Sequence, residues 1–196
     1  MKKIILMTAF MLIGAVSPVF SETYRVSPES AKVRWDASKV TGKHWGHIPL
    51  VSGTIVFEGG QFVGGETVLD ARSIAVDDIQ DPESNAKLTR HLKSADFFDA
   101  EGFPEASLKI TGVESRGEDN YLVTGDLTIK GVTQSVSFPA AVKMTAQGVQ
   151  ASAQITVDRT QYGIRYGSGK FFENLGDRLI HDEFQLTVEV SAEASR

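Results

Sequence analysis

Two of the four histidines in the chain, His44 and His47, lie close together in the stretch TGKHWGH, residues 41–47. Imidazoles can ligate a metal ion, transfer protons or contact a polar headgroup. A zinc-type site needs further ligands, which the sequence does not bring together here. In an extended segment, residues three apart point to opposite sides, which weakens the pair as a chelate. A metal site, solvated or hydrogen-bonded histidines and a headgroup contact therefore stay open. We expect elemental analysis of tag-free protein to find no stoichiometric zinc, copper or iron.

The elements that position these histidines follow from a period of two in the apolar residues. Eight stretches alternate apolar and polar side chains, which is typical of strands with one buried and one wet face. They begin at Ala31, Ser52, Gly65, Glu105, Asn120, Thr133, Val149 and Asp182. Short turns such as Lys130-Gly131 join neighbours, which favours an antiparallel meander. Eight strands can close into a barrel without exposed edges, so the pattern predicts an all-β barrel.

Two stretches depart from this alternation. From Pro82 to Ala95 the apolar residues recur at helical spacing, with Ser84 as the expected N-cap, so we predict one short helix between strands 3 and 4. The stretch from Arg159 to Asp182 is long for a connection between strands, and it is rich in glycine and aromatic residues. Loops of this length in a compact domain are usually functional or partly structured.

The first 21 residues have the pattern of a secretory signal peptide. Lys2 and Lys3 precede a short apolar run, and Pro18 ends it. The run is shorter than the roughly 20 residues that a spanning helix needs. We therefore expect residues 1–21 to be removed on export and 22–196 to form one domain in the periplasm, with no integral membrane segment. Loss of Lys2 and Lys3 takes the formal net charge from −5 to −7, which disfavours nucleic acid as a partner. The chain has no cysteine, which excludes disulfides and thiol chemistry.

The predicted inner faces mix large and small apolar residues. Trp35, Phe57, Leu108, Leu127 and Phe184 are large, whereas Gly125 and Ala153 are small. The small residues leave space for a ligand or only fit the taper of the barrel. No acid or base falls on these faces, so a cavity would be apolar and would bind an apolar chain. We expect Gly125→Leu to block ligand and leave the protein folded.

Two central blocks, HLKSADFFDAEGFPEASLKI at 91–110 and VTGDLTIKGVTQSVSFPA at 123–140, resemble the YceI family of exported lipid-binding proteins. The likeness runs from Tyr24 to the last strand. It implies an eight-stranded antiparallel lipocalin-like barrel with a long hydrophobic pocket. It also implies a polyisoprenoid or similar amphiphile as ligand, such as a quinone or an isoprenyl pyrophosphate. One departure is His44-Trp45, where many members have an aromatic or aliphatic position, so ligand contacts are not carried over there.

The candidate ligand contacts are the residues expected at the inner face or at the rim of the barrel. They are Trp35, His44, Trp45, Phe57, Phe97, Phe98, Leu108, Gly125, Leu127, Ala153, Arg159, Tyr162, Arg165 and Phe184. Trp45, Phe97 and Phe98, together with Phe103, would gate the pocket or pack the helix against the barrel. Arg159, Arg165 and Lys170 would bind an anionic headgroup, or they would serve as surface charge or pair with Asp158 and Asp177. No catalytic residue, metal or cofactor is expected.

The sequence leaves three functions open. The first is a periplasmic protein that carries or stores an apolar or isoprenoid-type lipid. The second is an enzyme that acts on such a lipid, with His44, His47 or His91 as acid–base groups. The third is an interaction protein whose barrel is only a scaffold. Homodimerisation is left open. Retention of lipid through purification distinguishes the first function from the other two.

Overall fold

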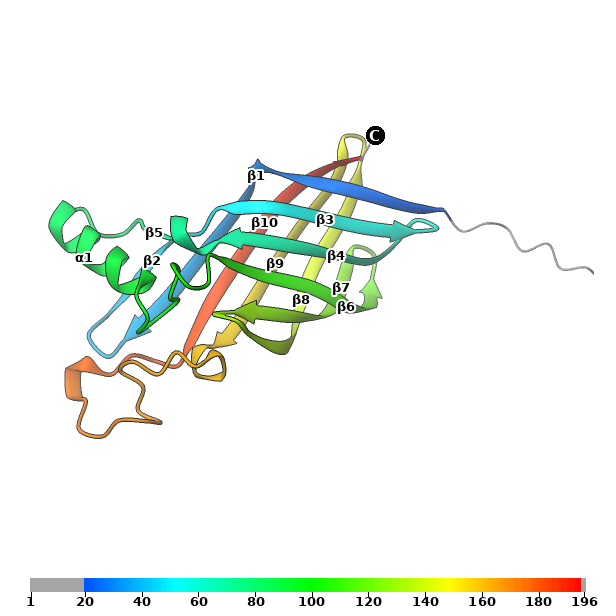
Figure 1. The fold of residues 1–196 in the computed structure, drawn as a ribbon. Coiled ribbons are helices and arrows are strands. Elements are labelled where there is room, and N and C mark those ends of the chain that lie inside the picture. The colour runs from blue at the N-terminus through cyan, green and yellow to red at the C-terminus, as the bar shows by residue number, and fades with distance from the viewer. Residues whose placement is uncertain (1–19, 195–196) are drawn as a thin grey trace, which may run out of the picture.

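The computed structural model describes residues 20–194, and in it eight antiparallel strands close into a barrel (Figure 1). The barrel strands are β1 (Ser21–Lys39), β3 (Leu50–Glu58), β4 (Gln61–Asp70), β6 (Glu105–Gly117), β7 (Asn120–Ile129), β8 (Val132–Thr145), β9 (Gly148–Asp158) and β10 (Glu183–Ala194). Neighbours along the chain pair with each other, and β10 pairs with β1 to close the ring. The predicted barrel of eight antiparallel strands is confirmed.

Two short strands outside the ring were not predicted. β2 (Gly42–His47) pairs with the end of β1, and β5 (Ala75–Val76) pairs with β2. The stretch with the two histidines is therefore a strand that lies outside the ring. β5 has only two residues, which is too short for any period to be recognised.

β1 exchanges one neighbour for another along its length. Residues 21–26 pair with β3, and residues 34–39 pair with β2. The change follows a register shift between Val26 and Ala31, where Pro28 has no N–H to donate to a ladder. The second half of β1 thereby carries β2 and β5 beside the barrel.

The hairpin between β7 and β8 turns at Lys130-Gly131, as predicted. Lys130 has φ of 51° and Gly131 has φ of 72°, which is the backbone of a two-residue type I′ turn. Asparagine and glycine are the usual residues at the first position, so a lysine there is held by its surroundings. Its side chain accordingly has a fixed place at one end of the barrel.

The predicted helix is confirmed, but its N-cap is not Ser84. α1 (Pro82–Lys93) begins after Asp81, whose carboxylate accepts a hydrogen bond of 2.9 Å from the Ser84 N–H. Pro82 then occupies the first turn, where its missing N–H costs nothing. Among the described residues, no helix is long and apolar enough to cross a membrane.

The described residues also contain three 3-10 helices: η1 (Ala71–Ser73), η2 (Arg159–Tyr162) and η3 (Gly176–Arg178). η2 and η3 lie in the long connection between β9 and β10. We call the stretch from Gly163 to Ile180 the 163–180 loop. It hydrogen-bonds to the turn between β1 and β2, since Val40 N–H donates to Leu179 O at 3.1 Å. Directly after the loop, His181 N–H donates to Ser38 O of β1 at 3.0 Å. The 163–180 loop, that turn and α1 all lie at one end of the barrel (Figure 1).

Candidate functional site

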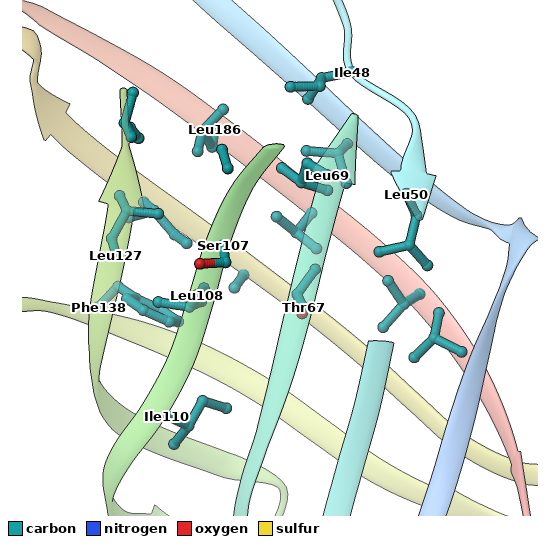
Figure 2. Close-up of a pocket in the computed structure, with 18 of the residues that line it drawn as sticks. Ile48, Leu50, Thr67, Leu69, Ser107, Leu108, Ile110, Leu127, Phe138 and Leu186 are labelled. Carbon is teal, nitrogen blue, oxygen red and sulfur yellow. The ribbon is translucent and has the colours of Figure 1, made fainter. Parts of the chain in front are cut away.

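An apolar cavity of about 160 Å³ occupies the interior of the barrel. All eight barrel strands supply side chains to it, because every second residue of each strand points inward. Figure 2 shows aliphatic side chains converging on the space, with the hydroxyl of Thr67 among them. The lining includes Val26, Val33, Trp35, Ile48, Leu50, Ile55, Thr67, Leu69, Ala106, Leu108, Ile110, Val123, Leu127, Phe138, Ala140, Ala151, Ala153, Ile155, Phe184, Leu186, Val188 and Val190.

Small residues on two neighbouring strands produce part of this space. Ala140 of β8 and Ala153 of β9 are paired across the ladder, and both line the cavity. Both are half-buried, and their methyl groups leave more room at these positions than larger side chains would. The ladder between β8 and β9 starts at this pair, directly after Pro139, which has no N–H to donate.

Aromatic side chains seal one end of the barrel. Tyr24, Phe57, Phe62 and Tyr121 form a chain of ring contacts with centroid separations of 5.7, 5.9 and 5.3 Å. Phe57 and Phe62 are paired next to the turn between β3 and β4, and both are buried. Such edge-to-face and tilted contacts fill the narrow end without leaving space for a ligand. We call these four residues the sealed end.

The opposite end of the cavity has a different border. Phe98, Phe103, Glu105 and Lys130 line it there, and Phe98 lies 6.4 Å from the Phe184 ring between centroids. Lys130 donates a hydrogen bond of 2.5 Å from Nζ to Ala95 O. Glu105 and Lys130 are the charged residues of the lining, and we call this border the open end.

Six of the predicted ligand contacts line the cavity. They are Trp35, Phe98, Leu108, Leu127, Ala153 and Phe184. Trp35 is also anchored, because its indole N–H donates to Ala75 O at 3.0 Å. Contact between these residues and a ligand stays a prediction, since no bound molecule is present.

Phe57 and Gly125 are buried but are not part of the cavity lining. Phe57 belongs to the sealed end, behind Phe62. A Cβ on Gly125 would lie 2.9 Å from Leu108 Cδ1 and 2.9 Å from the backbone oxygen of Lys109. The expectation that Gly125→Leu keeps the fold intact is therefore corrected: a leucine would press on backbone rather than fill empty space.

His44, Trp45 and His47 lie away from the cavity. Each histidine donates from Nδ1 to its own aspartate at 2.8 Å, His44 to Asp78 and His47 to Asp77. Burial opposes ionisation of Asp78, but hydrogen bonds from His44 and from the Trp45 N–H outweigh it and hold the pKa of Asp78 below its ordinary value. These contacts are those of hydrogen-bonded surface histidines, which was one of the three interpretations.

Trp45 packs outside the barrel rather than over its opening. The Arg34 guanidinium lies 4.1 Å from the centroid of its ring. Across residues 20–194, no three histidine, cysteine or acidic side chains gather as a metal site would require. No histidine lines the cavity either, so the described residues offer no imidazole for acid–base chemistry on a ligand there.

Arg159 has a structural role that the sequence did not reveal. It is 4% exposed, and its guanidinium donates to four backbone oxygens, those of Ile164, Tyr166, Ile180 and His181, at 2.8 to 3.1 Å. A fifth contact reaches Asp182 Oδ1 at 3.5 Å. With its donors used in this way, Arg159 is not available to an anionic headgroup. It ties the two ends of the 163–180 loop together.

The other predicted contacts of this region also serve the loop. Arg165 is exposed and lies 4.8 Å above the Phe171 ring. Tyr162 is 1% exposed, its hydroxyl has no partner, and burial raises its pKa to about 12. Phe97 packs against Tyr166 and against the His91 ring, so it joins α1 to the loop rather than gating the cavity. None of these three side chains, Arg165, Tyr162 and Phe97, lines the cavity.

Several lining residues were missed from the sequence. Ile48 and Leu50 precede the alternating stretch that was recognised as a strand, and Lys130 lies just outside a strand. Thr67 is an inward position occupied by a polar residue. Leu69 and Ala71 follow Thr67 at intervals of two residues and also line the cavity, so the period of two could have revealed that Thr67 points inward.

A closed antiparallel barrel with one apolar cavity, sealed at one end, defines a class of proteins that enclose a single small apolar ligand site. The chain belongs to the YceI-like family, because the sequence model of the YceI-like domain matches residues 24–192. A UPF0312 protein of Pseudomonas putida strain W619 is 36% identical over 121 residues. This match spans 60% of the present chain and 60% of that relative's length.

Solved structures show the same fold. BcnA of Burkholderia cenocepacia is 20% identical, with a TM-score of 0.68 over 84% of this chain and 98% of that chain. A polyisoprenoid binding domain of Saccharophagus degradans, implicated in plant cell wall breakdown, is 15% identical, with a TM-score of 0.65 over 88% and 98% of the two chains. At these identities the likeness concerns the fold alone.

Proposed function

We propose that this protein binds one apolar chain of the isoprenoid or acyl class in its barrel cavity and carries or stores it in the periplasm. The observation that supports this most directly is the cavity itself. It is apolar along its length, it is sealed at one end by four aromatic residues, and its charged residues, Glu105 and Lys130, stand at the other end. This arrangement suits an amphiphile with its tail inside and its head at the open end.

The energetics set the orientation of such a ligand. Each Å² of apolar surface removed from water contributes about 25 cal/mol, so a hydrocarbon tail is stabilised by every segment that enters. An ionised head deep in the cavity would lose its hydration, and the lining there offers it only hydroxyl groups, those of Thr54, Thr67, Ser107 and Ser152. A neutral head such as a quinone and an anionic head such as a pyrophosphate both fit at the open end, where Lys130 provides a positive charge.

The size of the cavity limits what enters without rearrangement. An apolar cavity of roughly 150 Å³ holds a molecule of the size of benzene. The cavity of about 160 Å³ seen here therefore matches one segment of a long chain. We propose that a longer chain is accommodated by rotation of half-buried inward side chains such as Leu108 and Ile110, which border the empty space.

The family supports a binding role. One structural neighbour is itself described as a polyisoprenoid binding domain, and it shares the closed barrel. Catalysis is not supported by any particular observation, because the three histidines that could act as acid–base groups pair with aspartates outside the cavity. We therefore place this chain among binding proteins.

Export is the second part of the proposal. The signal peptide expected over residues 1–21 lies almost wholly outside the described residues, so it is argued from its sequence pattern alone. Cell fractionation with N-terminal sequencing of the mature protein tests it. A periplasmic protein that starts near Glu22 is expected. A cytoplasmic protein that retains Lys2 and Lys3 would contradict it.

The experiment that tests ligand binding is extraction of the native protein. We expect organic solvent to release close to one equivalent of an isoprenoid or acyl lipid from protein purified without detergent, with identification by mass spectrometry. Delipidated protein should then take up a ubiquinone or an isoprenyl pyrophosphate, and bound ligand should raise its melting temperature. Protein that neither releases nor takes up any lipid would favour the scaffold function instead.

A further inference from the structure

Exposed aromatic side chains are concentrated at the open end of the barrel. In the 163–180 loop, Tyr166 is 45% exposed, Phe171 is 44% exposed and Phe172 is 51% exposed. Val40, on the turn between β1 and β2 that hydrogen-bonds to this loop, is 56% exposed. Single exposed apolar side chains are normal on a protein surface, whereas several gathered in one region point to a surface that contacts something else.

The 163–180 loop holds these rings in place rather than leaving them loose. Ser168 is fully buried, and its backbone oxygen accepts hydrogen bonds of 3.1 Å from the N–H groups of both Phe171 and Phe172. Lys170, which precedes them, is tied to Asp158 at 2.8 Å. Together with the contacts of Arg159 to four backbone oxygens, these bonds fix the loop while its aromatic side chains face water.

The charge around the rings has the opposite sign to the rest of the protein. Arg165 and Arg178 lie on the loop, and Lys39 and Lys43 flank the β1–β2 turn at the end of β1 and the start of β2. Against Glu173 and Asp177 of the loop they give a net charge of about +2 without the paired Lys170. The whole chain has a formal charge of −5. The neighbouring stretch 81–101 has five acidic and three basic residues, so the positive surface is confined to the loop and the turn.

We propose that this tip, formed by the 163–180 loop and residues 39–43, docks on the surface of a phospholipid bilayer containing anionic lipid. Phe171, Phe172 and Val40 would enter the headgroup region, and the lysines and arginines beside them would meet lipid phosphates. A symmetric dimer through the same tip is less favourable, because it would bring the positive side chains of two copies together. The proposal rests on the proposed function, since a lipid carrier has to meet the membrane where its ligand resides.

The tip lies next to the open end of the cavity. Tyr166 lies 5.5 Å from Phe97 between ring centroids, and the next residue, Phe98, lines the cavity. The docked tip would therefore place the open end next to the bilayer, and an apolar tail would cross from membrane to cavity without passing through water.

Vesicle binding of the full mature chain tests the proposal without any ligand. Flotation is measured with vesicles of phosphatidylcholine alone and with vesicles that also contain phosphatidylglycerol. The expected result is stronger binding to the anionic vesicles, reduced by about tenfold or more in the double variant Phe171→Ala with Phe172→Ala. Lys39→Gln with Lys43→Gln should reduce binding to the anionic vesicles and leave binding to pure phosphatidylcholine unchanged.

The control variant is Val63→Ala with Met144→Ala, which removes two exposed apolar side chains that lie outside the tip. Vesicle binding equal to that of the unmodified protein is expected there. Binding that is unaffected by loss of both phenylalanines would overturn the proposal. So would a dimer seen by sedimentation velocity that dissociates in the phenylalanine double variant, because the rings would then belong to a protein interface.

Measurements of lipid uptake distinguish a failure of the docking proposal from a failure of the proposed function. The phenylalanine double variant should retain the equilibrium affinity for a ubiquinone added in detergent and lose only the rate at which it takes ubiquinone from vesicles. Normal docking with no uptake would refute the carrier function alone. Normal uptake from vesicles by a variant that no longer docks would refute the role of the tip alone.

Discussion

The two ends of the barrel are built from different parts of the chain. The sealed end consists of four aromatic residues on the barrel strands themselves, packed ring against ring. The open end is bordered by Phe98 and Phe103, which lie between α1 and β6, and by Lys130 in a hairpin turn. Strand residues are fixed by two ladders each, whereas the residues at the open end depend on a few specific hydrogen bonds.

Because of this difference, the stability of the fold and the binding of a ligand depend on different ends of the barrel. A closed ring of paired strands with a well-filled aromatic end provides a rigid wall against which an apolar tail can pack. Segments that leave the ring can differ in their residues without breaking a ladder, so the open end is where charge and exposed rings are tolerated. Substitutions at the sealed end should therefore change stability most, and substitutions at the open end should change ligand binding most.

The largest effect is expected for Phe57→Ala. It removes a ring that is 3% exposed and contacts two others, so the free energy of unfolding should fall by about 3–5 kcal/mol. Chemical denaturation measures this. Phe103→Ala at the open end is the matched control, and since its ring is 38% exposed it should cost much less. Equal losses at the two sites would mean that the ends do not differ as described.

The next largest effect is expected for Arg159→Lys. A lysine amine cannot reach the four backbone oxygens that the guanidinium bonds, and each unsatisfied buried group costs about 1–3 kcal/mol. We expect the melting temperature to fall and proteolysis within the 163–180 loop to increase. Arg165→Lys, on the exposed side of the same loop, should leave both unchanged. A lysine variant as stable as the parent would show that the loop does not depend on this contact.

The wall of the barrel could be predicted from the sequence because alternation is a property of each strand alone. Trp35, Leu108, Leu127 and Phe184 were placed inward by a period of two, and all four line the cavity. Closure of the ring was predicted from strand number and short turns. β2 and β5 were missed since their pairing depends on the switch of neighbours along β1, which no local pattern records.

The ends of the barrel were less predictable for a physical reason. For Arg159 the sequence left a headgroup contact and ordinary surface charge open, because its charge is visible in the sequence and its four backbone partners are not. Lys130 was predicted in a turn, but the sequence did not indicate that this turn, with φ of 51° at Lys130, brings the side chain to the cavity border. Contacts made by loops depend on tertiary placement, so residue type alone does not assign them.

A smaller effect on stability, with a clear effect on binding, is expected for Ala153→Leu. The new side chain would enter the space in front of the Ala140–Ala153 pair, so lipid occupancy should fall by about tenfold or more while the protein stays folded. Gln154→Leu is the matched control, because it adds the same side chain to the exposed face of β9. Lipid extraction and thermal melts are measured on both. Full occupancy in the Ala153 variant would place the ligand elsewhere.

The smallest effect is expected for Lys130→Gln, and it bears on the nature of the ligand's head. Lys130 is the positive charge of the cavity border, and its amine already donates to Ala95 O, so it can add a charge-assisted hydrogen bond to an anionic head without changing position. Glutamine keeps the length and a donor but removes the charge. The affinity for an isoprenyl pyrophosphate should therefore fall severalfold, whereas the affinity for a ubiquinone should be unchanged.

Lys109→Gln on the exposed face of β6 should affect neither. If both ligands weaken equally in the Lys130 variant, the amine acts by holding the stretch around Ala95 in place. If neither weakens, the head of the ligand lies outside the reach of the open end.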